Sequence, residues 1–320
     1  MKIIKPANLL YTIALIALFT LSAAFAQEEA QDTIPAPPPA APAKPDTVCF
    51  KFGFQPKDTL FYRVGGMDSI IYDYEPALTK VRYSRIMLIC DSVRDGKMYM
   101  TQSLVTFTST ENKSYIKGVK RDDTPWLNRK VHFVIDSVGT RYNWWVDDST
   151  NAALTPGGAF EPVLIFPFKE SCKAVDESWI ESSKDYYPEN GVPVSVVQQS
   201  TLFRAMAEVD TLGERCSRMR FVRTGQGAVY IVDERVKMAV TSVLNSSGMI
   251  TISKEKQVPM HYFSTVEQKL KIKAPDKADR PAWQYTNVDY VLEELRRHPA
   301  TTESAATPVN RPAKKKKSKR

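Results

Sequence analysis

Apolar and polar residues alternate with a period of two along most of the central part of the chain, and this pattern most restricts the fold. Such alternation turns one side of a segment toward a core and the other toward solvent, as in antiparallel strands. Four runs show it clearly, at residues 82–89, 97–104, 131–135 and 194–207. We therefore predict an all-β, mainly antiparallel fold.

Short turn sequences separate these runs. Four of them, at residues 91–96, 136–139, 210–213 and 245–248, begin with Asp or Asn and end with Gly. The first residue can hydrogen-bond its own backbone, and the glycine can take a positive φ. The sequence therefore predicts a series of long hairpins.

The spacing of the turns suggests two related halves. The segment around Asp58 precedes the turn at Asp91 by 33 residues, and the segment around Asp176 precedes the turn at Asp210 by 34. We interpret this as a diverged duplication. The predicted halves cover residues 47–150 and 162–298, joined by a loop at 151–161. Together they would form a curved sheet, a half-barrel or a sandwich.

One segment is typical of a helix. Thr286 and Asp289 resemble a capping box, and an apolar stripe at helical spacing follows. The stripe consists of Val288, Val291, Leu292 and Leu295. We expect a short C-terminal helix that docks on the sheet.

The N-terminal residues indicate export. Residues 1–26 combine two lysines, an apolar run and an Ala-Phe-Ala end, which is typical of a cleaved secretory signal. An uncleaved membrane anchor is the alternative. Residues 27–46 form a Pro/Ala-rich linker expected to be disordered. We expect a location in the periplasm or outer envelope, or secretion.

The chain has 320 residues and a formal net charge of +8, but its ends carry this excess. The C-terminal tail contributes seven positive charges and the signal two, which leaves −1 for the rest. Nucleic acid is therefore an improbable partner. The tail, residues 299–320, is expected to be disordered and either solvated or bound to an anionic envelope surface. Its candidate residues are Lys314, Lys315, Lys316, Lys317, Lys319 and Arg320.

Four cysteines in an exported chain are candidates for disulfides. They are Cys49, Cys90, Cys172 and Cys216, and three pairings are open to them. Similar separations make a bridge within each half, Cys49 with Cys90 and Cys172 with Cys216, the simplest expectation. Free buried thiols are the alternative.

The usual catalytic signatures are missing from the sequence. No nucleophile elbow, phosphate-binding loop or C-x-x-C motif occurs, and the chain has three histidines. His132 and His261 lie in strand-like runs, where a structural role is the more frequent one. We predict no metal, no cofactor and no enzyme activity.

An aromatic cluster is the most suggestive local feature. Tyr142, Trp144 and Trp145 fall in one strand-like run. Because neighbouring residues of a strand face opposite ways, one tryptophan would enter the core while the other could stack on a ligand. We treat the three as candidate ligand-binding residues, with core packing as the alternative.

The order of signal, proline-rich spacer and two β-rich halves resembles secreted bacterial families of unknown function. The clearest motifs are 176–179, Asp-Glu-Ser-Trp, and the Asp-[Ser/Thr]-x-Gly turns. Those families are similar to the curved half-barrel of lipoprotein-localisation carriers. The resemblance covers about residues 48–273 and implies a concave sheet that holds an acyl chain or a partner segment, with no catalytic residues to transfer.

Our leading hypothesis is an exported, non-enzymatic envelope protein that binds a lipid or an envelope protein on a β scaffold. One alternative is an envelope hydrolase or modifying enzyme, which would need His132 or His261 beside a carboxylate and a nucleophile in a pocket. A second alternative is a structural adaptor tethered by the lysine-rich tail.

Overall fold

The computed structural model describes residues 46–124, 126–147, 164–189, 192–233, 236–273 and 278–297. Contacts divide the chain into Met1–Lys44 and Pro45–Arg320, and all described residues belong to the second unit. The signal, the linker up to residue 45, the connecting loop at 151–161 and the basic tail therefore lie outside the described residues. Their predicted roles stay predictions.

Strands make up the regular structure of the described residues. In chain order they are β1 (Thr47–Cys49), β2 (Thr59–Tyr72), β3 (Leu78–Arg94), β4 (Lys97–Lys113), β5 (Ile116–Arg121), β6 (Lys130–Ile135), β7 (Arg141–Val146), β8 (Cys172–Ala174), β9 (Ser178–Glu189), β10 (Val192–Thr211), β11 (Glu214–Asp233), β12 (Val236–Ser253), β13 (Pro259–Lys273) and β14 (Arg280–Arg296). Within these described ranges, no helix is long and apolar enough to cross a membrane.

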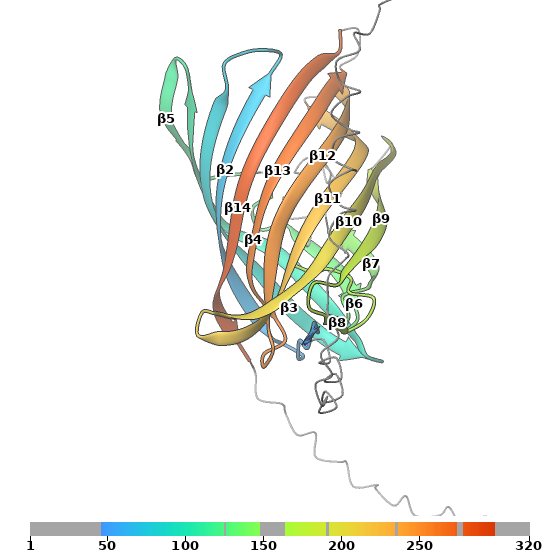
Figure 1. The fold of residues 1–320 in the computed structure, drawn as a ribbon. Coiled ribbons are helices and arrows are strands. Elements are labelled where there is room, and N and C mark those ends of the chain that lie inside the picture. Colours follow the sequence, from blue (N-terminus) through green and yellow to red (C-terminus); the bar gives the residue numbers. More distant parts are fainter. Residues whose placement is uncertain are drawn as a thin grey trace, which may run out of the picture. The chain divides into compact units, whose positions relative to one another are not determined.

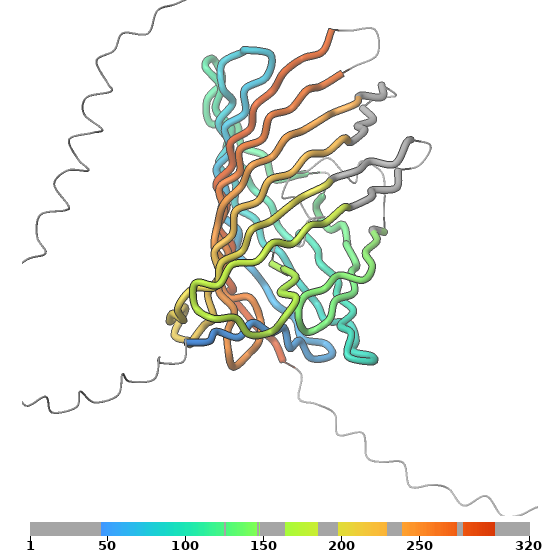
Figure 2. The backbone as a smooth tube through the Cα atoms, turned by 45° about the vertical axis from the view of Figure 1, so that its right-hand side comes forward, coloured from blue at the N-terminus to red at the C-terminus, as the bar shows by residue number. Residues whose placement is uncertain are grey.

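Twelve of the strands form one curved antiparallel sheet (Figure 1). Its order is β7-β6-β4-β3-β2-β14-β13-β12-β11-β10-β9, with β5 paired to β4 beside this path. β7 and β9 are the two ends of the sheet, which stays open between them (Figure 2). The all-β, antiparallel and curved fold predicted from the sequence is confirmed.

The two predicted halves supply neighbouring parts of this sheet. Strands β2–β7 form one wing and β9–β14 the other, and the wings meet where β2 pairs with β14. The short strands β1 and β8, one from each half, pair with each other in a separate two-stranded sheet. The origin of the halves by duplication stays a prediction.

Three of the four predicted turns join hairpins. Gly96, Gly139 and Gly213 close them with φ of 71°, 78° and 79°. In the second turn, Asp136 Oδ1 accepts hydrogen bonds from the backbone N–H groups of Val138 and Thr140, at 3.0 and 2.9 Å. This is the local bonding that the sequence predicted.

The fourth predicted turn, at residues 245–248, is wrong, because these residues lie inside β12. Gly248 serves close packing instead. A Cβ at this position would collide with the carbonyl oxygen of Phe263 and come within 2.6 Å of the Phe221 ring. The glycine lets an aromatic ring lie directly on the backbone of the strand.

The predicted C-terminal helix is also wrong. Its residues belong to β14, a strand held between β13 and β2. Val288, Tyr290 and Leu292 alternate as buried residues with a period of two. The sequence of these residues is compatible with a helical period and with a period of two, and strand pairing on both sides favours the strand. The expected capping residue Thr286 donates its hydroxyl to Asp68 Oδ1 at 2.7 Å.

The disulfide pairing within each half is wrong as well. Cys49 bonds to Cys172, its direct partner in the β1–β8 pair, and joins the two halves. Cys90 and Cys216 are free and buried. Sequence separation could not show that the first strands of the two halves lie side by side.

Candidate functional site

The sheet has two faces with different chemistry. We call inner the face that carries Leu60, Tyr62 and Val64 on β2, and outer the face that carries Arg63 and the residues in phase with it. Register pairs extend this assignment across the sheet. The inner face is the concave one, because residues 47–54 and 164–174 pack against it between the wings.

These two segments form an inner plug rich in phenylalanine. The ring of Phe166 lies 5.4 Å from Phe203 and 5.3 Å from Phe221, both on inner positions of the second wing. Phe168 lies 5.3 Å from Phe50 and 5.1 Å from Phe52. Backbone hydrogen bonds from Phe52 and Phe168 to the β6–β7 turn fix the plug to the first wing. The plug therefore fills the inner side at one end of the strands.

Beyond the plug, toward the β2–β3 turn, the inner face becomes polar. Eight polar residues there are at most 9% exposed. We call them the polar zone: Asp68, Ser84, Ser109, Thr201, Ser246, Ser264, Gln268 and Thr286. Small hydroxyl and amide side chains thus alternate with apolar residues such as Leu244, Val266 and Leu270 on this part of the inner face.

A buried ion pair anchors the polar zone. Arg82 Nε lies 2.9 Å from Asp68 Oδ2, and the two side chains are 16% and 6% exposed. Gly66 makes this pair possible, because a Cβ there would lie 2.8 Å from Arg82 Nε. Thr286 satisfies the second oxygen of Asp68. The pair is held in one geometry from three strands.

A second set of charges lies beside it on β3, β4 and β5. Glu111 contacts Lys80 at 3.2 Å and Arg121 at 2.9 Å. Burial raises the pKa of Glu111, but hydrogen bonds from Arg121 and Lys80 lower it on balance below its ordinary value. This carboxylate is therefore ionised at neutral pH.

Some polar atoms of the inner face have no hydrogen-bond partner among the described residues. They include Ser264 Oγ and Gln268 Oε1 on β13, Ser109 Oγ on β4 and Glu181 Oε1 on β9. Native proteins satisfy most buried polar atoms, so such groups indicate bound water or a ligand. The sequence analysis missed them, and their only signal was polar residues at inward positions of strands.

The predicted aromatic cluster lies elsewhere, on β7 at one end of the sheet. Trp144 packs against the core, whereas Tyr142 and Trp145 are 53% and 45% exposed. The predicted split between the tryptophans is confirmed. Lys97 Nζ lies 4.1 Å from the centre of the Tyr142 ring, and Trp145 stacks on His132 at 5.2 Å. Neighbouring side chains thus already use the exposed rings, and their ligand-binding role stays a prediction.

His132 has a carboxylate and a hydroxyl beside it, as a hydrolase would need, but the hydroxyl is not arranged to give its proton to the imidazole. Its Nε2 lies 2.9 Å from Asp147 and its Nδ1 2.8 Å from Thr101 Oγ1. The Thr101 hydroxyl donates to Asp91 at 2.5 Å, so its hydrogen is directed to a carboxylate and not to the imidazole. This histidine cannot accept the hydroxyl proton in the observed geometry.

His261 is paired to Asp289 at 2.5 Å on the outer face.

Burial raises the pKa of Cys90 to about 12, with Asp58 and Asp91 adding to the effect, and burial also raises the pKa of Cys216. Neither thiol is a nucleophile at neutral pH. In the described part of the chain, no group of His, Cys, Asp or Glu is arranged to hold a metal ion.

A hollow of about 430 Å³ lies near the β10–β11 turn and the end of β14. Its lining mixes Leu212, Met260 and Leu292 with charged residues such as Glu255 and Arg297. Ion pairs already occupy its carboxylates Glu214, Glu293 and Glu294.

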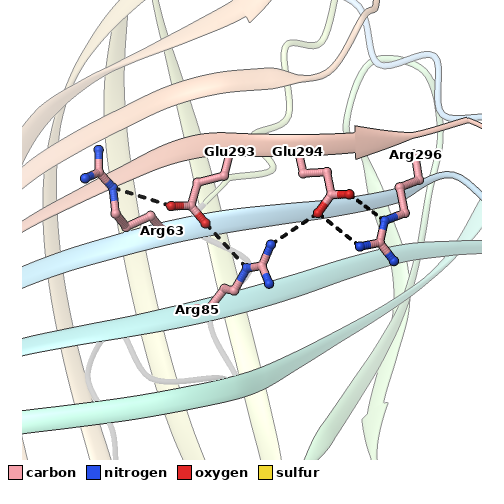
Figure 3. A network of polar contacts seen from close by, with 5 residues as sticks. All are labelled: Arg63, Arg85, Glu293, Glu294 and Arg296. Atoms are coloured by element: carbon pink, nitrogen blue, oxygen red, sulfur yellow. Dashed lines mark hydrogen bonds and ion pairs between the residues drawn. The ribbon is translucent and has the colours of Figure 1, made fainter.

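Figure 3 shows the outer part of this network. A bulge in β14 lets the adjacent residues Glu293 and Glu294 both contact arginines of β2, β3 and β14. Arg85 bridges the two carboxylates, at 3.4 and 3.2 Å, while Arg63 and Arg296 contact one each. The network ties β2, β3 and β14 together at the junction of the wings, which is a structural role.

Comparisons with known proteins leave the family open. No family model and no curated protein matches the chain. Among solved structures, one described as "Lipid-protein interactions in lipovitellin" is similar over 79% of this chain. The identity is 10%, the TM-score is 0.39, and the match spans only 27% of that chain. A likeness at this level carries no argument about the ligand.

Proposed function

We propose that this chain is an exported, non-enzymatic envelope protein whose half-barrel holds an extended segment of a partner protein against its inner face. The observation that carries the proposal is the pair of buried, unpartnered acceptors Ser264 Oγ and Gln268 Oε1. They lie four residues apart on one strand, so a chain running along β13 would meet both.

The chemistry of the inner face favours a polypeptide over an acyl chain. Inner apolar residues such as Tyr62, Phe203 and Phe221 are already buried together with the plug. In the polar zone, Leu244, Val266 and Leu270 alternate with hydroxyl and amide groups, and covering those groups with hydrocarbon alone would leave them without hydrogen bonds. A peptide offers an N–H and a C=O at every residue.

The end of the sheet supports the same class of ligand. Within the described residues, β9 pairs on one side only, with β10. On the inner side of β9, the donor Trp179 Nε1 and the acceptor Glu181 Oε1 lack hydrogen-bond partners. An extended segment could add to this strand through its backbone and satisfy both groups with the same chain.

The disulfide favours an exported location. Such bonds persist in oxidising compartments and are rare in the cytosol. The Cys49–Cys172 bridge links β1 to β8 covalently, and both of its cysteines are exposed. The proposed partner is accordingly an exported protein.

Native mass spectrometry tests the proposal. The purified protein is offered a pool of soluble twelve-residue peptides together with palmitate. We expect peptide adducts, weakened about tenfold by Gln268→Met, which removes a hydrogen-bonding amide at nearly constant volume. The matched control is Gln226→Met, an exposed glutamine on the outer face of β11, which should bind as the parent does. Palmitate adducts without peptide adducts would show that the ligand is a lipid and not a protein segment. No adduct at all would contradict binding at the inner face.

A further inference from the structure

The outer face of β9, β10 and β11 carries an apolar strip at one end of the sheet. Ile180, Leu202 and Val222 are direct lateral neighbours, since the register pairs Leu202 with both of the others. They are 61%, 46% and 48% exposed. The solvent side of an antiparallel sheet is normally polar, and adjacent exposed aliphatic side chains mark an interaction surface.

Arginines flank this strip on one side, and Ser182, Ser200 and Thr224 form the row on its other side. The next lateral row places Arg204 opposite Arg220, and Arg218 follows along β11. Among the outward-facing residues described at 178–184, 198–206 and 218–228, no side chain is a carboxylate. Arg204 reaches Asp176 at 2.9 Å, just before β9, while Arg218 Nε has no partner. The surface is therefore both apolar and positive.

We propose that this outer patch, defined as Ile180, Leu202, Val222, Arg204 and Arg220, docks on the surface of an anionic lipid bilayer. Aliphatic side chains would enter the headgroup region while the guanidinium groups contact lipid phosphates. Protein interfaces instead concentrate their binding energy in Trp, Tyr and Arg, with Leu and Val under-represented. Charge complementarity and the aliphatic strip together select the lipid surface.

The size of the patch fits a peripheral contact. Three strands spaced about 4.8 Å apart give an apolar strip of about 10 Å across. Such a contact is weak alone, and stable attachment to a membrane usually combines two signals. The basic tail, with Lys314, Lys315, Lys316 and Lys317, supplies a second cationic element in the sequence. The inference goes beyond the proposed function, because it concerns the face opposite the inner one.

Vesicle sedimentation tests the patch. Binding to phosphatidylcholine vesicles that contain phosphatidylglycerol is compared with binding to pure phosphatidylcholine. The variants are made in a chain whose Lys314 to Lys317 are glutamine, so that the tail does not mask the patch. We expect Leu202→Ser to weaken partitioning about tenfold and Arg220→Gln about fivefold. Pure phosphatidylcholine should bind poorly.

The control is Leu212→Ser in the same hairpin. Leu212 is 56% exposed but lies in the β10–β11 turn, outside the patch, and this variant should bind like its parent. Parent-like binding by both Leu202→Ser and Arg220→Gln would overturn the proposal. A change in oligomeric state of lipid-free Leu202→Ser in sedimentation velocity would also overturn it, because a second copy would then cover the patch. Neither result bears on peptide binding at the inner face.

Discussion

Cys49 and Cys172 face each other across the β1–β8 pair, and their disulfide joins strands from the two predicted halves over a sequence separation of 123 residues. A covalent link of this span removes many conformations from the unfolded chain. The plug that it anchors contacts both wings of the sheet. Breaking the disulfide should therefore loosen the packing of the plug against the inner face.

Loss of this bond should destabilise the protein strongly. We expect Cys49→Ser to lower the free energy of unfolding by about 5 kcal/mol, as loop closure of this length predicts. Thermal unfolding with and without reductant measures it. Reductant should lower the melting temperature of the parent and leave that of Cys49→Ser unchanged. A parent indifferent to reductant would contradict the observed pairing.

The buried ion pair of the polar zone should also be needed for stability. Asp68→Ala leaves the Arg82 guanidinium and the Thr286 hydroxyl without their acceptor, and we expect a loss of about 3 kcal/mol in unfolding free energy. Denaturant titration measures this loss. The matched control is Asp210→Ala, whose side chain is 75% exposed and 3.5 Å from Arg215, with an expected loss below about 1 kcal/mol. Equal losses would refute the special role of Asp68.

Two glycines of the sheet should respond in opposite ways to alanine. At Gly248 a Cβ would meet the Phe263 carbonyl and the Phe221 ring, so Gly248→Ala should cost about 2 kcal/mol or more. At Gly65 nothing lies within 4 Å of an added Cβ, and Gly65→Ala should be neutral or stabilise by about 0.5 kcal/mol. Chemical unfolding of both variants tests this. A tolerated Gly248→Ala would contradict the close ring contact.

The free cysteines should be unreactive in the folded protein. Burial, reinforced by Asp58 and Asp91, raises the pKa of Cys90 to about 12, so its thiol stays protonated at pH 8. Iodoacetamide should modify neither Cys90 nor Cys216 in the native state and both after denaturation, as followed by intact mass. Native labelling of Cys90 would show that the thiol is accessible and ionised.

The same raised pKa links stability to pH. An unfolded thiol ionises near about pH 8.5, whereas the folded Cys90 thiol stays neutral up to about 12. The folded state therefore holds more protons above pH 8.5, and this contribution to stability is present below that pH and lost as the pH rises toward 12. Unfolding free energy should fall over this window, and Cys90→Ala should reduce the slope.

Local patterns in the sequence were sufficient for several strands and most of the turns. Period-two alternation identified β3, β4, β6 and β10, and Asp136 and Gly139 behaved as their turn chemistry predicts. These features depend on neighbours within a few residues. Their signals are therefore present in the sequence itself.

The wrong or missing predictions concern residues whose environment depends on strands that are distant in the sequence. Thr286 to Leu295 satisfied a helical pattern, and only the strands on both sides of β14 show why the period of two prevailed. Gly248 looked like a turn residue until Phe221 was placed above it. The polar zone had no motif at all, because Ser264, Gln268 and Asp68 become neighbours only when the sheet is assembled.

Photo-crosslinking at two adjacent glutamines of β10 tests the central claim most directly. Gln199 is half-buried on the inner face and Gln198 is exposed on the outer face, so one chain position separates the two surfaces. A benzophenone side chain is placed at either position in the exported protein, irradiated in the producing cells, and the adducts are identified by mass spectrometry. The account predicts a defined polypeptide adduct from position 199 that is absent from position 198. The same polypeptide adducts from both positions, or none from position 199, would contradict a binding site on the inner face.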